Sequence, residues 1–337
     1  MLSACAKSET SGGSTTTNQS AAAQVTQSAA AGATCTLSQF GGQKVDLTTA
    51  KVGFSQSEKE DNPFRIAETQ SIKDEAAKLG IKNLTATNAN SQFDKQITDV
   101  DTLIDSGVQL LVIAPLNSDG WDAVFAKATA KKIPIITIDR KINARSCTDY
   151  LTFIGSDFKM QGKRAADQMA KALNNTGNVA ILDGSPGNGV TTDRGAGFKD
   201  ELAKVAPNIK VVFEQTGNFN RQDGQKVTEQ LLQANPNING IYGENDEMAI
   251  GAVTALKGAN KKAGDVKVVS IDGTRTAVQD IVDGWIFAVV ESNPRFGPLA
   301  FSTATDFFNG KAIPDNVIIQ DREYDASSAQ AGLSVAF

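Results

Sequence analysis

A pair of charged side chains follows a short apolar run, where a buried strand would leave its sheet. The run from Ile133 to Ile138 is rich in β-branched residues and too short for a helix, and Asp139 and Arg140 follow it directly. Such a run predicts a strand buried on both faces of a parallel sheet. In open α/β sheets, ligands bind beyond the carboxyl ends of the strands, and a carboxylate beside a guanidinium can hold a hydroxyl-rich molecule. A solvated loop pair or a local salt bridge is the alternative, so the prediction depends on how the other strands end.

Similar groups follow the other predicted strands. Amides, carboxylates, guanidiniums and aromatic rings recur there, a composition that suits a neutral polyol, because an aromatic face also packs on the apolar side of a sugar ring. We interpret Asp246 and Glu247 as mostly structural, since acidic side chains favour a helix N-terminus. The remaining candidates for ligand contact are Ser55, Phe64, Arg65, Arg194, Phe219, Asn245, Asp272, Glu291 and Asn293.

The composition argues against several other kinds of site. The chain has no histidine, which removes histidine-based triads, general bases and metal ligands. The Gly-rich segment 184–189 lacks the GK[ST] of a P-loop and Gly53 is a lone glycine, so no nucleotide cofactor is expected. Asp139 and Asp272 could imitate the paired carboxylates of a glycosidase, but a sugar-binding cleft needs them equally. We therefore expect a binding protein that is not an enzyme and uses no metal or cofactor.

The elements that would position these residues alternate between strand and helix. The alternation runs from Lys51 to Ile138, restarts at Tyr150 and continues to Ile319, with crossovers long enough for right-handed βαβ units. Two such runs within 337 residues predict an α/β protein with two doubly wound parallel sheets. The formal net charge of −5 gives no support for a nucleic-acid surface.

The start of the chain indicates export and a lipid anchor. Leu2 to Cys5 matches the bacterial lipobox, although the basic and apolar parts of a signal peptide are missing. The stretch from Lys7 to about Ala33 is rich in Ser, Thr, Gly, Ala and Gln, and it has too few large apolar residues to fold. We predict an extracytoplasmic protein with a disordered tether over residues 1–34, held at the cell membrane only by lipidated Cys5. A disordered tail with a chance cysteine is the alternative.

The other two cysteines are Cys35 and Cys147. Disulfides persist in the compartment of an exported protein, so we hypothesise a Cys35–Cys147 bridge. It would join the segment before the first predicted strand to the loop after Arg140. Two free thiols are the alternative.

Several motifs, taken in order, resemble the ribose- and galactofuranose-type sugar-binding proteins, the solute receptors of bacterial ABC importers. The resemblance covers about Lys51 to Ile319. It implies two lobes joined by a three-segment hinge, a first lobe of 36–154 plus 292–318 and a second of 155–291 plus 319–337. The matching motifs are Val52-Gly53-Phe54-Ser55-Gln56, Asp139-Arg140, Asp193-Arg194-Gly195-Ala196-Gly197-Phe198, Asn245-Asp246-Glu247-Met248-Ala249-Ile250-Gly251-Ala252 and Ile271-Asp272-Gly273.

The resemblance also implies a function. It indicates a monomeric receptor that binds a pentose or hexose, among them a furanose such as galactofuranose, and delivers it to an importer permease. Phe64-Arg65 and Glu291 resemble the galactofuranose type, whereas the insertion from Glu58 to Asp61 departs from ribose receptors. A sugar sensor of the same fold that signals to a membrane partner is the alternative. Related repressors carry an N-terminal helix-turn-helix where this chain has a lipobox, which argues against DNA binding. The implied sugar contacts are Phe64, Arg65, Asp139, Arg140, Arg194, Phe219, Asn245 and Asp272, with Glu291 and Asn293 at the second crossing.

Overall fold

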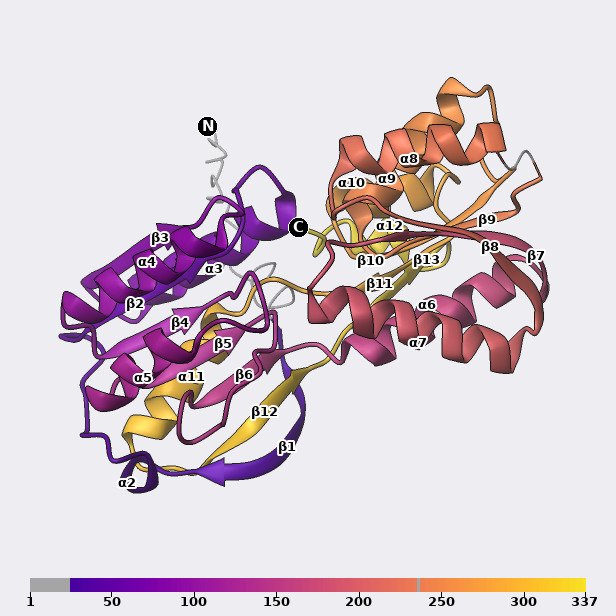
Figure 1. The fold of residues 1–337 in the computed structure, drawn as a ribbon. Helices are drawn as coiled ribbons and strands as arrows, with labels where there is room; N and C mark the ends of the chain where they lie inside the picture. The colour runs from indigo at the N-terminus through magenta and orange to yellow at the C-terminus, as the bar shows by residue number, and fades with distance from the viewer. Residues whose placement is uncertain (1–24, 235–236) are drawn as a thin grey trace, which may run out of the picture.

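The chain forms two lobes, each built on one mostly parallel sheet, as Figure 1 shows. The structure is a computed structural model that describes residues 25–234 and 237–337. The predicted α/β class with two doubly wound sheets is confirmed. No helix in these two ranges has both the length and the apolar character needed to cross a bilayer. The predicted lipid anchor, Cys5, lies outside the described residues.

The first sheet has helices on both faces. Its neighbouring strands are parallel, except for an antiparallel pair at one edge. In spatial order the strands are β1 (Gln27–Cys35), β12 (Ile313–Ile319), β6 (Thr152–Gly155), β5 (Ile135–Ile138), β4 (Leu110–Ile113), β2 (Lys51–Gln56) and β3 (Asn83–Asn88). The helices of this lobe are α2 (Leu37–Phe40), α3 (Pro63–Lys78), α4 (Phe93–Asp105), α5 (Asp122–Ala130) and α11 (Gly297–Phe308).

The second sheet repeats this plan, with one antiparallel edge strand. In spatial order its strands are β13 (Glu323–Asp325), β11 (Ala288–Glu291), β10 (Lys267–Asp272), β9 (Gly240–Gly243), β7 (Thr176–Asp183) and β8 (Asn208–Thr216). Its helices are α6 (Phe158–Ala172), α7 (Gly189–Val205), α8 (Arg221–Ala234), α9 (Asp246–Gly258), α10 (Arg275–Val282) and α12 (Ala329–Gly332).

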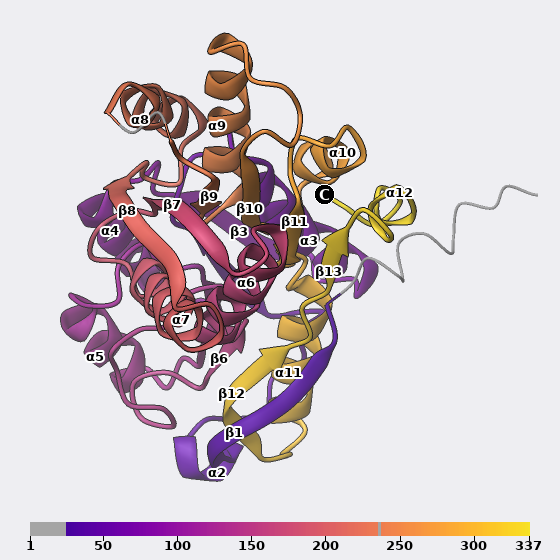
Figure 2. The ribbon, with the colours of Figure 1, turned by 90° about the vertical axis from the view of Figure 1, so that its right-hand side faces the viewer.

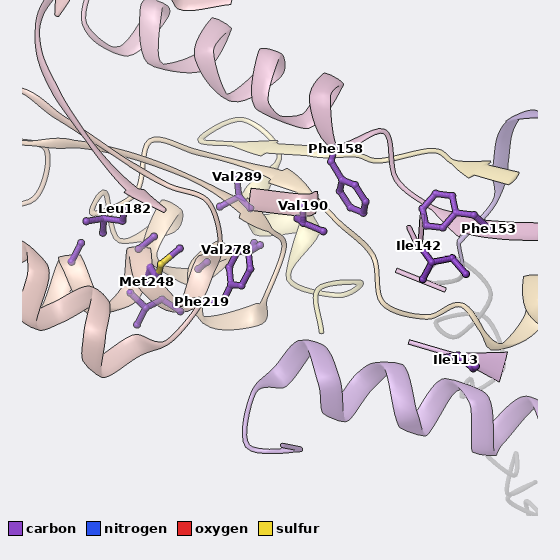
Figure 3. Close-up of a cluster of buried hydrophobic side chains, with 14 of the residues drawn as sticks. Ile113, Ile142, Phe153, Phe158, Leu182, Val190, Phe219, Met248, Val278 and Val289 are labelled. Carbon is purple, nitrogen blue, oxygen red and sulfur yellow. The ribbon is translucent and has the colours of Figure 1, made fainter. Parts of the chain in front are cut away.

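The apolar core follows from strands that bury both faces. In β2, Val52 and Phe54 pack under α3 and α11, whereas the alternate positions of β4, such as Leu111, pack under α4 and α5. One buried cluster continues from the first lobe into the second. Figure 3 shows the Phe158 ring between Val190 of the second lobe and Phe153 of the first. The Phe153 side chain is buried.

Three segments cross between the lobes, after β6, β11 and β12. Asp321 in the third crossing accepts hydrogen bonds from Ser156 Oγ in the first, at 3.0 Å, and from Gln161 Nε2, at 2.8 Å. Gln161 Nε2 also donates to the main-chain carbonyl of Glu291, at the start of the second crossing, at 3.3 Å. Buried polar side chains therefore tie the three crossings to one another.

Residues 27–34, which the prediction assigned to a disordered tether, instead belong to strand β1, while residues 1–24 lie outside the described residues. Sequence composition missed this strand because its side chains are small and mostly exposed. The strand pairs antiparallel with β12, from Gln27 opposite Ile319 to Cys35 opposite Ile313, and Figure 2 shows the two strands side by side. Such pairing satisfies the backbone groups at a sheet edge and needs no large apolar residue.

The hypothesised bridge between Cys35 and Cys147 is confirmed as a disulfide, with 5.3 Å between the two Cα atoms. It joins the end of β1 to the loop between β5 and β6, so both of its ends belong to the first lobe. The bridge therefore fastens the edge strand to the loop that follows the Asp139-Arg140 pair.

Candidate functional site

A chamber of about 350 Å³ lies between the carboxyl ends of the two sheets. Both lobes contribute to its wall, and it opens into a wider polar mouth of about 1640 Å³ that shares Glu58, Asn62 and Phe219 with it. The residues that line the chamber are Glu58, Asn62, Phe64, Arg65, Asp139, Arg140, Val190, Arg194, Phe219, Asn245 and Asp272.

The first-lobe half of the chamber is a network of charges around Arg65. The Arg65 Nη1 atom donates to Asp139 Oδ2 at 2.6 Å and to Glu68 Oε2 at 2.9 Å, while Nε donates to Glu58 Oε2 at 2.8 Å. Pro63 at the first position of α3 and Asn62 as its N-cap start the helix, which aims Arg65 at the strand ends. Arg65 is therefore held in place by three carboxylates.

Asp139 and Arg140 leave β5 through a tight turn. Asp139 has a left-handed backbone, with φ of 63°, and the Arg140 amide donates to the Ile138 carbonyl at 2.7 Å. This conformation is uncommon for a residue with a side chain and marks a backbone constrained by its surroundings. The turn points both side chains into the chamber wall, as the strand-end argument predicted.

Glu58 is one of three chamber residues, with Asn62 and Val190, that were not among the predicted ligand contacts. Its Oε2 atom accepts from Arg65, and its Oε1 atom accepts from Arg140 Nη2 at 2.7 Å. Although burial acts in the opposite direction, the neighbouring Arg140 and Arg65 lower the Glu58 pKa to about 2. Glu58 is therefore a charged bridge between the two first-lobe guanidiniums. The insertion from Glu58 to Asp61 was visible in the sequence, but the sequence did not reveal which side chains its residues contact.

The second-lobe half of the chamber positions Arg194 mainly with neutral oxygens. Arg194 Nε donates to Gln161 Oε1 at 2.9 Å, and Nη1 donates to the Glu244 carbonyl at 2.7 Å. Asp272 Oδ1 is 3.6 Å from Arg194 Nη2. Because Gln161 also binds Asp321 and the Glu291 carbonyl, one side chain connects Arg194 to the crossings.

Asp246 holds the loop that follows Asp272. Its side chain accepts from Ser270 Oγ at 2.6 Å, from the amides of Gly273 at 2.9 Å and Thr274 at 2.7 Å, and from Thr274 Oγ1 at 2.9 Å. Burial raises the pKa of Asp246 to about 6 and that of Asp272 well above its ordinary range. The interpretation of Asp246 as structural fits these contacts. The loop that Asp246 holds begins at Asp272, whose backbone has a positive φ of 143°.

Asn245 and Phe219 support each other across the second-lobe wall. Asn245 Oδ1 caps α9 by accepting from the Met248 amide at 3.0 Å, and its Nδ2 donates to the Phe219 carbonyl at 3.1 Å. Phe219 has a left-handed backbone, with φ of 58°. A Cβ atom on Gly184 would lie 2.0 Å from the Phe219 ring, so this glycine leaves room for the ring. The Gly-rich segment thus has a packing role that its sequence did not reveal.

Three candidate residues lie outside the chamber lining. Ser55 is buried behind it, where its Oγ accepts from Gln96 Nε2 at 3.3 Å. Glu291 accepts from the Tyr324 hydroxyl at 2.8 Å and from the Arg322 amide at 3.1 Å, at the second crossing. Asn293 follows in the same crossing, where its Oδ1 accepts from the Arg295 amide at 3.0 Å. The structure brings the other eight candidates together: Phe64, Arg65, Asp139, Arg140, Arg194, Phe219, Asn245 and Asp272.

The chamber can offer hydrogen bonds to a neutral ligand. Arg140 Nε is buried and makes no hydrogen bond within the described residues, with Asp139 Oδ2 3.6 Å away. A buried donor left unpaired costs about 1–3 kcal/mol, so a ligand hydroxyl accepting from Arg140 would remove that cost. The carboxylates of Asp139 and Asp272 can accept from hydroxyls, and the rings of Phe64 and Phe219 offer apolar faces.

Comparisons with known proteins agree with this geometry. Residues 52–312 match the family described as the periplasmic binding protein domain. The galactofuranose-binding protein YtfQ of Escherichia coli strain K12 is 34% identical over 273 residues, which cover 80% of this chain and 85% of that protein. The fructose import binding protein FruE of Bifidobacterium longum strain NCC 2705 is 32% identical over 306 residues, covering 89% and 92%.

Solved structures give the same result. A protein from Mycobacterium smegmatis in complex with β-D-fucofuranose has a TM-score of 0.80 and 34% identity, with 85% of this chain and 94% of that chain covered. The binding component of the arabinose ABC transporter of Shewanella sp. ANA-3, bound to α- and β-L-arabinofuranose, has a TM-score of 0.80 and 33% identity, covering 84% and 94%. Three of these four proteins are named as binding proteins, and the fourth was solved with a bound furanose.

Proposed function

We propose that this chain, which belongs to the periplasmic binding protein family, binds a monosaccharide in the chamber and delivers it to an ABC importer. The family places the protein outside the cytoplasm. The observation that carries the proposal is a chamber with hydrogen-bonding groups on two sides. Arg65, Asp139 and Arg140 face it from the first lobe, and Arg194 and Asp272 face it from the second.

Ligand contacts with both walls would favour a closed arrangement of the lobes. A ligand shifts such an equilibrium only by its differential affinity for the two states, and a sugar held from both sides has that property. We take the lobes to be 36–154 plus 292–318 and 155–291 plus 319–337. A few charge-assisted hydrogen bonds, each worth about 1.5–3 kcal/mol, would support micromolar binding, about −8 kcal/mol.

The test is a panel of sugars against the purified protein. D-Ribose, L-arabinose, D-galactose and D-fructose would be compared by thermal shift, since a cleft ligand stabilises only the folded state, and binders would then be titrated calorimetrically. We expect at least one to bind in the micromolar range. A panel in which no pentose, hexose or polyol shifts the melting temperature would contradict the proposal. Incubation with sugar oligomers should give no turnover, which separates a receptor from a glycosidase.

Transport and sensing are distinguished in cells. For transport, deleting the gene should abolish growth on the bound sugar at low concentration, and expression of the wild-type chain should restore it. Unchanged growth with loss of a transcriptional response to the sugar would instead indicate a sensor of the same fold.

The lipid anchor is proposed from the lipobox alone. We propose that Cys5 carries the lipid and that the protein is otherwise a monomer without further attachment to the membrane. Metabolic labelling with a fatty-acid analogue should mark the wild-type protein and leave the Cys5→Ala variant unmarked. Equal labelling of both would exclude Cys5 as the acylated residue.

A further inference from the structure

We infer that Glu58 makes the chamber selective for neutral over anionic sugars and, in the same role, positions its two first-lobe arginines. The inference rests on the proposed function, since it concerns the same chamber. Glu58 is on the loop between β2 and α3, within the segment by which this chain departs from ribose receptors. It is thus a specificity-determining residue for which the resemblance supplied no role.

The positioning part follows from the contacts. The two oxygens of Glu58 divide between two guanidiniums, one 2.8 Å from Arg65 Nε and the other 2.7 Å from Arg140 Nη2. Both arginine side chains are about 5% exposed, and the Glu58 side chain is 18% exposed. Charge-assisted bonds at such distances are strong and directional. Without Glu58, Arg140 would keep Asp139 as its nearest carboxylate, with the closest approach at 3.6 Å.

The selectivity part follows from the charge balance of the lining. The charged residues that line the chamber within the described chain are three guanidiniums and three carboxylates. In the first-lobe half of the lining, Glu58 and Asp139 balance Arg65 and Arg140, so that half has no surplus cation to compensate a buried anionic ligand. Removing the Glu58 charge would leave one uncompensated guanidinium, which favours an anion. The six are Arg65, Arg140 and Arg194 with Glu58, Asp139 and Asp272.

Glu58 is better placed for this role than the other two carboxylates. Asp139 and Asp272 are fixed at strand ends, with left-handed backbones and side chains about 5–7% exposed. Glu58 alone among the three lines both the chamber and its mouth. A carboxylate on a ligand that lies against this part of the wall would therefore meet a like charge.

The experiment compares neutral sugars with their acids. Wild type, Glu58→Gln and Glu58→Asp would be titrated with D-ribose, L-arabinose and D-galactose, and with D-ribonate, L-arabinonate and D-galacturonate. Glu60→Gln is the matched control, because it removes the same charge from an exposed residue of the same loop. Thermal melts of each variant would establish that it is folded.

We expect Glu58→Gln to lose at least tenfold in affinity for the neutral sugar that wild type prefers, and to gain at least fivefold for an acid. Glu58→Asp keeps the charge but is too short to reach both arginines, so it should weaken neutral binding and still reject the acids. Glu60→Gln should match wild type on both counts. This exchange of preference is a readout that a purely structural role for Glu58 would not produce.

The inference is overturned if Glu58→Gln binds no acid more tightly than wild type and Glu60→Gln do. Failure of the proposed function looks different, since wild type would then bind none of the neutral sugars. The comparison of Glu58→Gln with wild type on the acids tests Glu58 in either case.

Discussion

The two halves of the chamber hold their arginines in different ways. In the first lobe, Arg65 and Arg140 are fixed by carboxylates at 2.6–2.9 Å. In the second, Arg194 is fixed by an amide oxygen and a main-chain carbonyl, and its nearest carboxylate, on Asp272, is 3.6 Å away. The first half is therefore organised by charge before a ligand arrives, whereas the second keeps a cation whose carboxylate partner is only loosely engaged.

The acidic side chains of the two halves also differ in their pKa shifts. Arginine neighbours lower the pKa of Glu58 to about 2, so it stays charged over the physiological range. Burial instead raises the pKa of Glu244, behind Arg194, to about 8. Glu68, behind Arg65, is intermediate, since burial raises its pKa to about 7 although Arg65 opposes the shift. We therefore expect the second half to respond more strongly to pH, and the first to loss of a charged partner.

The largest effect on the second half of the chamber is expected when the Asp246 side chain is removed. Asp246→Ala leaves four donors in the Ser270–Thr274 segment without their acceptor, and it frees the loop that carries Asp272. We expect a loss of about 4 kcal/mol in the free energy of unfolding, measured by urea denaturation, and more than tenfold in sugar affinity. Asp200→Ala, at an exposed position of α7, should leave both unchanged. Similar melts for the two variants would contradict the role given to Asp246.

A disulfide adds a constraint to the first lobe. The Cys35–Cys147 bridge closes a separation of 112 residues, so its reduction should lower the free energy of unfolding by about 3 kcal/mol. The measurement is urea denaturation with and without dithiothreitol. A double Cys35→Ser, Cys147→Ser variant should reproduce the reduced value and lose its sensitivity to the reductant. A reductant effect that persists in the double variant would trace the loss to another cause.

The dependence on pH sharpens the contrast. A raised pKa in the folded state means that Glu244 contributes stability below about pH 4.5, which is lost as the pH rises towards 8. Glu244→Gln stays neutral, so between pH 5 and 9 it should lose less stability than wild type, by at least about 2 kcal/mol. Glu68→Gln should give a smaller difference and the exposed control Glu229→Gln none. If the stability of Glu244→Gln and that of wild type depend on pH in the same way, the expected difference between the two halves is wrong.

The smallest effect expected is on binding alone. Arg140→Ala leaves Glu58 without one of its partners and removes a buried donor, so calorimetry should show at least a tenfold loss of sugar affinity, about 1.4 kcal/mol. Arg145→Ala, in the same loop with a 77% exposed side chain, is the matched control. Equal affinities for the two variants would remove Arg140 from the site.

Much of this organisation was predictable from sequence because it depends on local pattern. Apolar runs bounded by polar groups fixed the strand order along the chain, and the groups after the strands included eight of the residues that line the chamber. β1 was missed because it is held by backbone pairing, which leaves no apolar signature. The bridge made by Glu58 was missed because its partner Arg140 is 82 positions away along the chain. Contacts of that range depend on how strands assemble, which local spacing does not encode.

The pairing of β1 with β12 has a mechanical consequence. Gln320, in the third crossing, donates its amide to the Thr26 carbonyl at 2.9 Å, so the described chain enters the fold beside the hinge and far from the tip of either lobe. A tether attached close to a hinge has a short lever arm. Tension along such a tether would exert little torque on the opening and closing of the lobes, and its attachment point would move little. With the anchor proposed at Cys5, both lobes would therefore remain free to open and close.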